Sequence, residues 1–195
     1  MSIWNILYKQ KLRRGDMKKS LWLWQLAGFT FTVVLGTLLH FLYDWTGSIG
    51  LAPFSAVNES TWEHMKILFF PMLIFAWIQF RFFKEEYPNF WCVKLAGIAL
   101  GVLLVPALFY TYNGAFGKSP DWLNVLFFFL SAGGGYLFEI YLFKRLFKRN
   151  NAPCKWSVFA LVLLYVLALA FVLFTFIPPR VPLFLDPVTG TYGLG

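Results

Sequence analysis

The chain has 195 residues, of which 59% are hydrophobic, 22% are aromatic and only 13% are charged. About a quarter of the residues in an ordinary soluble domain are charged, so this composition argues against a water-soluble protein and excludes a disordered chain or a coiled coil. The net charge of +8 fits a basic face at a membrane of anionic lipids. No known nucleic-acid-binding module accompanies it, so we expect membrane lipid, and no nucleic acid, as a partner.

Five apolar stretches are long enough, or nearly so, to cross the ~30 Å hydrocarbon core of a bilayer as helices. The predicted spans are residues 21–43, 61–83, 90–110, 122–143 and 156–177. The sequence therefore predicts an all-α integral membrane protein, a bundle of five transmembrane helices in one membrane domain, 21–177. Residues 1–20 are expected to form a basic cytoplasmic segment, and residues 178–195 an irregular tail.

The second span is the least certain by length, because its uncharged run, residues 67–80, is too short to cross alone. A re-entrant segment is the alternative. With five spans and the N-terminus inside, most of the 17 lysines and arginines lie on the cytoplasmic side, as the positive-inside rule requires. Four spans would instead place the basic loop 144–155 outside. We therefore expect the C-terminus outside, and a second span that carries some of its own charged residues into the membrane.

Residues 57–66, Val-Asn-Glu-Ser-Thr-Trp-Glu-His-Met-Lys, open this second span at its outer end. On a continuous helix, Glu59, Glu63 and Lys66 share one stripe and His64 points about 100° away from Glu63. An ionisable group at membrane depth is costly unless it is paired or hydrated. Glu63, His64 and Lys66 are therefore candidate catalytic residues, with a general base beside an electrostatic stabiliser acting on a lipid headgroup. A proton or ion relay through Glu63 and Lys66 is the alternative.

The two histidines of the chain, His40 and His64, both fall at this outer level together with several acids. Imidazole and carboxylate groups bind divalent transition metals, although the spacing is not that of a metalloprotease HExxH motif. The candidate ligands of a divalent metal are His40, His64, Glu59 and Glu63. The candidates for binding another ligand are Asp44, Asn58, Glu59 and Asp186, the last from the C-terminal tail if that tail forms a lid.

Structural interpretations of the same residues stay open. Ser60 and Glu63 match a capping box, or Asn58 caps the helix instead. Lys66 can extend outward or pair with Glu63 at i+3. The tail can be a frayed terminus, with a turn at Asp186.

The inner face is less informative. Cys92 and Cys154 are both expected there, toward a reducing compartment, so no disulfide is expected. Glu139 is interpreted as an interface residue balanced by Lys144 and Arg145. Few ionisable residues are predicted in the inner halves of the spans, which argues against a path through the membrane.

Five segments of the chain carry a resemblance to a known family: residues 39–44, 54–66, 69–72, 109–112 and 182–193. The most specific is the string Asn-Glu-Ser-x-Trp-Glu-His-x-Lys that ends at Lys66. These segments resemble a family of small polytopic membrane proteins, found mainly in Gram-positive bacteria and described as a domain of unknown function. The resemblance implies a multi-pass protein of the bacterial plasma membrane and implies no activity.

Together these features predict an outward-facing polar site at the ends of the first two helices, which binds a metal or a lipid headgroup. The rival interpretation is a non-enzymatic accessory membrane subunit or a small transporter. The sequence leaves open whether the protein is an enzyme and which protein partner it has.

Overall fold

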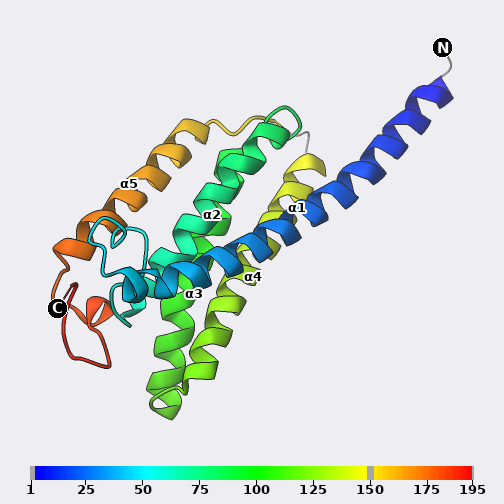
Figure 1. Ribbon diagram of the computed structural model, residues 1–195. Coiled ribbons are helices and arrows are strands. Elements are labelled where there is room, and N and C mark those ends of the chain that lie inside the picture. Colours follow the sequence, from blue (N-terminus) through cyan, green and yellow to red (C-terminus); the bar gives the residue numbers. More distant parts are fainter. Residues whose placement is uncertain (1–2, 149–151, 195) are drawn as a thin grey trace.

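The computed structural model describes residues 3–148 and 152–194, with side chains described for 20–146 and 152–194. The described chain is helical apart from its loops and one isolated β-bridge near the C-terminus. Figure 1 shows the elements in chain order, which are α1 (Ile3–Thr46), α2 (Thr61–Phe83), α3 (Phe90–Phe116), α4 (Asp121–Lys148), α5 (Ser157–Phe176) and the short 3-10 helix η1 (Pro182–Phe184).

Five of these helices are long and apolar enough to cross a membrane, so the prediction of an all-α protein with five candidate spans is confirmed. The second is a continuous helix of 23 residues, which includes Glu63 and Lys66. The first helix differs from the prediction, since it begins at Ile3 and its N-terminal part projects away from the other helices (Figure 1). Helix-forming residues continue N-terminally of the apolar span, which is why hydropathy alone missed this extension.

The α2 helix is the most buried of the five and packs against all the others. The most extensive helix pairing joins α3 to α4, while α1 packs on α2 and α4, and α5 packs on α3 and α2. Glycines allow the close approaches, because lipid provides no hydrophobic drive between helices and packing must do so. A Cβ added at Gly101 would lie 3.1 Å from the Ser131 carbonyl oxygen, and one at Gly28 would lie 2.6 Å from the Phe75 ring. Gly28 and Gly101 are thus points of close contact between helices.

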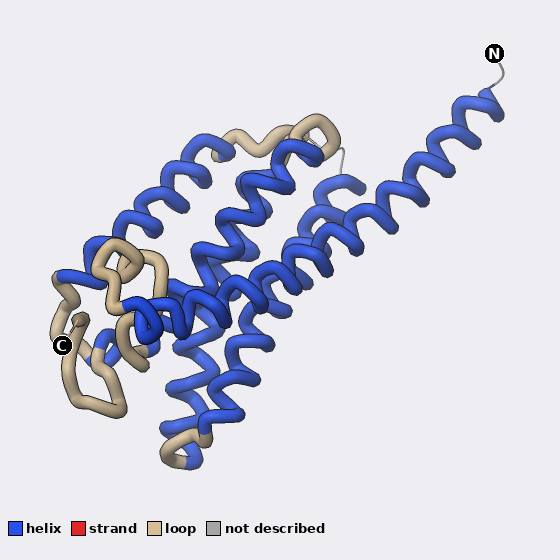
Figure 2. Tube along the Cα trace, viewed as in Figure 1, coloured by secondary structure: helices blue, strands red, loops and turns tan. Residues whose placement is uncertain are grey.

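The C-terminal tail is folded against the bundle rather than frayed. Phe184 is buried and contacts the rings of Trp62 and Phe174, at centroid distances of 4.6 and 5.6 Å. Leu185 and Tyr192 form the isolated antiparallel bridge that closes the tail into a loop. Figure 2 shows this tail beside the long loop between α1 and α2, at one end of the bundle. At that end of the bundle, the surface is therefore formed by both the α1–α2 loop and the C-terminal tail.

Cys92 and Cys154 are joined by a disulfide, with their Cα atoms 6.5 Å apart, so the expectation of free cysteines is wrong. The expectation rested on the redox state of a compartment, whereas pairing depends on distance. Cys92 lies in the first turn of α3 and Cys154 just before α5, and α3 packs beside α5. The bond ties these two helix ends together at the basic end of the bundle.

Candidate metal centre

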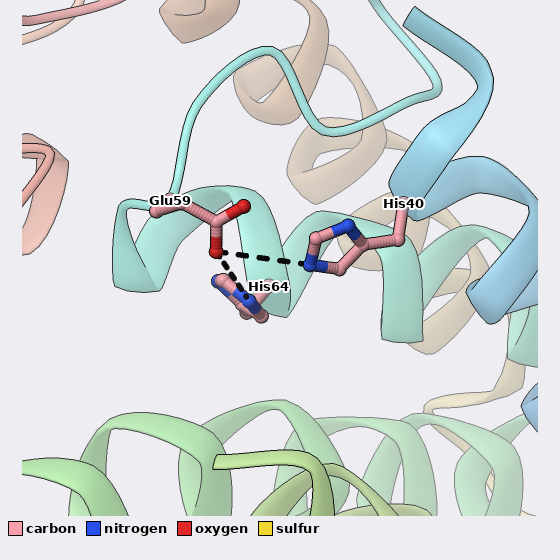
Figure 3. Close-up of side chains that lie close together, drawn as sticks. All are labelled: His40, Glu59 and His64. Atoms are coloured by element: carbon pink, nitrogen blue, oxygen red, sulfur yellow. Dashed lines mark ion pairs between the residues drawn. The ribbon is translucent and has the colours of Figure 1, made fainter. Parts of the chain in front are cut away.

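Three side chains converge where α1 ends and α2 begins. His40 comes from α1, Glu59 from the loop before α2, and His64 from the first turns of α2 (Figure 3). One oxygen of Glu59, Oε2, lies 3.6 Å from Nε2 of His64 and 3.8 Å from Nε2 of His40. The side chains of His40 and His64 are 24% and 23% exposed, and that of Glu59 is 46% exposed. The group is half-buried, and Glu59 is its most exposed member.

The ring orientation of His64 is set by Ser60, the residue just before α2. Its Nδ1 lies 2.9 Å from the carbonyl oxygen of Ser60. A carbonyl only accepts, so Nδ1 carries the proton and donates it. In the neutral ring, Nε2 then presents its lone pair to Glu59. Metal-bound histidines are commonly oriented in this way, by a hydrogen bond from the second ring nitrogen to a carbonyl.

The backbone around Glu59 is fixed on both sides. The Asn58 side-chain oxygen accepts from the Ser60 amide at 2.9 Å, and its amide nitrogen donates to the Gly193 carbonyl in the tail at 2.8 Å. Farther back, the amide of Ala56 donates to the carbonyl of Leu39 at 3.1 Å, beside His40. The loop therefore holds Glu59 in register with the end of α1.

The capping prediction for α2 is confirmed in part. The Ser60 hydroxyl accepts from the Glu63 amide at 3.4 Å, so Ser60 is the N-cap. The Glu63 carboxylate reaches back to the Val57 amide at 3.0 Å, and not to Ser60 as in a standard capping box. The helix starts at Thr61, so Glu59 lies before it. The predicted stripe of Glu59, Glu63 and Lys66 is wrong for that reason.

Glu63 and Lys66 form a separate, buried ion pair below the converging groups. Lys66 Nζ lies 2.5 Å from Glu63 Oε2, and the two side chains are 0% and 3% exposed. Lys66 also donates to the Ala52 carbonyl and to the Thr175 hydroxyl, each at 2.9 Å. Three acceptors use all three protons of the ammonium group. Glu63 therefore points away from His40 and His64, and the structure does not bring it into the predicted metal set.

Two other predicted ligands are not members of the set of three converging groups. Asp44 is exposed on α1. Asp186 is buried, and its carboxylate accepts from the Val188 amide at 2.8 Å and the Thr189 hydroxyl at 2.7 Å. This is the turn predicted at Asp186, and it leaves the carboxylate committed to the tail.

The distances suit a metal ion held by three ligands. Zinc binds imidazole nitrogen and carboxylate oxygen at ~2.0–2.2 Å, which places tetrahedral ligands about 3.4 Å apart. The candidate ligand atoms of His40, Glu59 and His64 all lie within 4.8 Å of one another. Small side-chain movements would close the set around an ion. A tetrahedral ion held by these three ligands keeps one position open.

A second polar group, which the sequence analysis missed, lies in the other half of the bundle. Lys94 and Glu139 are an ion pair at 2.6 Å, with side chains 1% and 0% exposed. The interpretation of Glu139 as an interface residue paired with Lys144 or Arg145 is wrong, because it points to α3 rather than along α4. The sequence did contain a signal for this pair, because Glu139 is a single acid at membrane depth and such a group needs a partner.

Searches of curated proteins and of solved structures find no match to this chain. Residues 9–194 match the family described as "Family of unknown function (DUF6512)". The match spans nearly all of the chain and all five candidate spans, and the protein therefore belongs to this family.

Proposed function

We propose that this protein is a plasma-membrane metalloprotein whose His40, Glu59 and His64 hold one divalent transition-metal ion. The supporting observation is the convergence of two imidazole nitrogens and one carboxylate oxygen at 3.6–3.8 Å. A neutral His64 presents a lone pair to the carboxylate, and a cation between these two acceptors would turn their repulsion into attraction. Zinc fits best, since two histidines and one carboxylate form one of its known catalytic ligand sets.

The open coordination position indicates the chemistry. Three protein ligands leave one position for water, whose pKa zinc lowers to about 7. The Phe41 and Trp45 side chains beside this site are exposed and stack on each other, at a centroid distance of 5.8 Å. Aromatic side chains of this kind suit the membrane interface. A lipid headgroup is therefore the proposed substrate class, and hydrolysis the proposed reaction.

The orientation of the site follows from charge. Basic residues gather at the opposite end of the bundle. They are Arg81, Lys84, Lys144, Arg145 and Lys155. Basic ends face the cytoplasm, so the metal end faces outward. A bacterial plasma membrane is the proposed location, on the family resemblance given above.

The test is elemental mass spectrometry of the protein purified in mild detergent without chelators. We expect about one zinc ion, or another divalent transition metal, per chain. The double variant H40A/H64A should lose it. The matched control D44A removes an exposed acid one turn from His40 on the same helix, and should keep the metal.

A second variant guards against misfolding of the histidine double variant. E59Q keeps the shape of the side chain but removes the anionic ligand, and should weaken metal binding at least tenfold. The d–d absorption of Co²⁺ added to the metal-free protein reports the same ligands. Absence of bound metal in the wild type, with no Co²⁺ spectrum, would reject the proposal.

A further inference from the structure

Four helices each place one fully buried polar side chain at the same level, toward the basic end of the bundle. These residues, here called the inner polar layer, are Gln25 of α1, Gln79 of α2, Lys94 of α3 and Glu139 of α4, each no more than 1% exposed. Trp24 contacts both Phe75 and Phe83, one turn on either side of Gln79, which sets Gln25 and Gln79 at one level. Two of the four members, Lys94 and Glu139, are ionisable, and the other two are neutral amides.

The charged members of the layer are under-coordinated. The Lys94 ammonium has one hydrogen-bond acceptor, Oε2 of Glu139, at 2.6 Å. Its other neighbours are the ring faces of Phe90 and Tyr136, at 5.6 and 5.5 Å from the centroids. An ammonium group has three protons to donate, so two of them lack an acceptor among the described residues.

The neutral members have unused hydrogen-bonding capacity as well. The Gln25 side chain reaches Glu139, yet both of its amide atoms lack a hydrogen bond of good geometry to any described residue. The two amide atoms of Gln79 lack such a hydrogen bond as well, and so does Oε1 of Glu139. Unpaired polar atoms cost about 1–3 kcal/mol each when buried, and in native proteins such groups commonly indicate water or a ligand.

The charges of the layer restrict what that ligand is. The Lys94 ammonium repels metal cations, and the Glu139 carboxylate repels anions. All four side chains are buried, so the ligand is small. A neutral water molecule meets all three conditions, and a proton that it delivers neutralises Glu139 by bonding to the carboxylate. Ionisable groups at membrane depth commonly serve as proton relays.

We propose that the inner polar layer is an intramembrane proton-binding site, in which Glu139 takes up the proton and water held by Gln25 and Gln79 delivers it. On uptake, an O–H bond of a hydronium ion breaks, a bond from the proton to Glu139 forms, and one water molecule is released. Lys94 keeps its three protons, and the layer gains one positive charge. The rings of Phe90 and Tyr136 face the ammonium group and stabilise it by cation–π attraction once the carboxylate is neutral.

The groups that act on Glu139 are few. Among the described side chains, its ionisable neighbours are Lys94 from α3 and Tyr136 from α4, the helix of Glu139 itself. Gln25 from α1 is a neutral amide neighbour. Tyr136 is hydrogen-bonded to Thr32 at 2.9 Å. This site does not depend on the proposed metal site, whose residue His64 lies at the opposite end of α2.

The test is infrared difference spectroscopy of the full chain in lipid nanodiscs, between about pH 9 and about pH 5. We expect a carbonyl stretching band of a protonated carboxylic acid to appear on acidification and to be absent in E139Q. The matched control E85Q removes an exposed carboxylate near the same end of the bundle and should keep the band. Failure of any E139Q-sensitive band to appear would overturn the proposal.

A second variant covers the case in which E139Q does not fold. Q25L leaves both charges in place and removes the amide beside the carboxylate. We expect it to shift the frequency of the acid band, because the water held by the amide is lost. An acid band that is identical in Q25L and the wild type would assign the titrating group elsewhere and overturn the proposal.

Discussion

The two buried lysine–glutamate pairs of this protein have the same chemistry and different surroundings. In the outer pair, Lys66 donates to three acceptors, and Glu63 also accepts from the Val57 amide. In the inner pair, Lys94 has one acceptor among the described residues, and Oε1 of Glu139 has no hydrogen bond of good geometry to any of them, although the Gln25 side chain reaches this carboxylate. A pair whose hydrogen bonds are all made holds the backbone in place, whereas a buried pair with unused donors and acceptors can bind a ligand.

The outer pair holds in place the α1–α2 loop, which carries Glu59 of the proposed metal site. Through Ala52 and Thr175, Lys66 ties the α1–α2 loop to α5, and Glu63 ties the same loop to α2. Neither charged group faces His40 or His64. A catalytic role for Glu63 and Lys66 stays a prediction, and the geometry favours a positioning role.

The difference between the two pairs is tested most strongly by removing one lysine at a time. Lys66→Met leaves the buried Glu63 carboxylate unpaired and three contacts unmade, so we expect a loss of about 3–5 kcal/mol in the free energy of unfolding. Lys94→Met should cost less, about 1–3 kcal/mol, since Glu139 can become neutral by taking up a proton. Denaturant titration in mixed micelles measures both.

The exposed Lys84→Met, near the end of α2, is the control for loss of a lysine, with an expected change of at most about 0.5 kcal/mol. Equal losses for Lys66→Met and Lys94→Met would show that the difference in hydrogen bonding between the two pairs has no energetic consequence.

Reduction of the disulfide should lower the stability of the protein and leave metal binding at the outer end unchanged. The Cys92–Cys154 bond closes a loop with a sequence separation of 62, for which chain entropy predicts a stabilisation of about 4 kcal/mol. Engineered and native bonds often deliver less, so we expect a loss of about 2–4 kcal/mol on reduction. Thermal unfolding with and without reductant measures it, with C92S/C154S as the reference. Loss of bound metal on reduction would contradict the independence of the two ends.

A single methyl group at Gly97 should disturb the inner pair directly. A Cβ built there would overlap Cγ of Glu139 and lie 2.7 Å from its Oε1. We expect Gly97→Ala to cost about 1–3 kcal/mol by overpacking, and to weaken the infrared band of Glu139.

The control for that variant lies in the same helix. Gly114 has nothing within 4 Å of a built Cβ, so Gly114→Ala should stabilise α3 by about 0.5–1 kcal/mol through helix propensity. If both variants shifted stability in the same direction, the contact of Gly97 with Glu139 would not be the cause of the loss.

Hydropathy and charge distribution were sufficient to predict the five helices, because these depend on residues close in sequence. The i+3 spacing offered the Glu63–Lys66 pair as one of two alternatives for Lys66, and the structure shows the pair. The spatial neighbours of Glu59 could not be predicted in this way, since they depend on where α2 starts. Gln25 and Gln79 are neutral residues in apolar runs, and only the packing of four helices reveals that they share a level with Lys94. The disulfide likewise depends on α5 returning beside α3.

The smallest effect expected is at the N-cap of α2, and it separates backbone from side-chain support of the proposed metal site. Ser60 contributes its hydroxyl to the Glu63 amide at 3.4 Å, a long contact, and its carbonyl to His64 Nδ1 at 2.9 Å. Ser60→Ala removes the hydroxyl and keeps the carbonyl, so we expect a loss of about 0.5–1 kcal/mol in stability and little change in metal affinity. Ser55→Ala, which removes another buried hydroxyl of the same loop, is the matched control. A tenfold loss of metal in Ser60→Ala, with Ser55→Ala unchanged, would mean that the cap itself fixes the position of His64, because the carbonyl that orients its ring is still present.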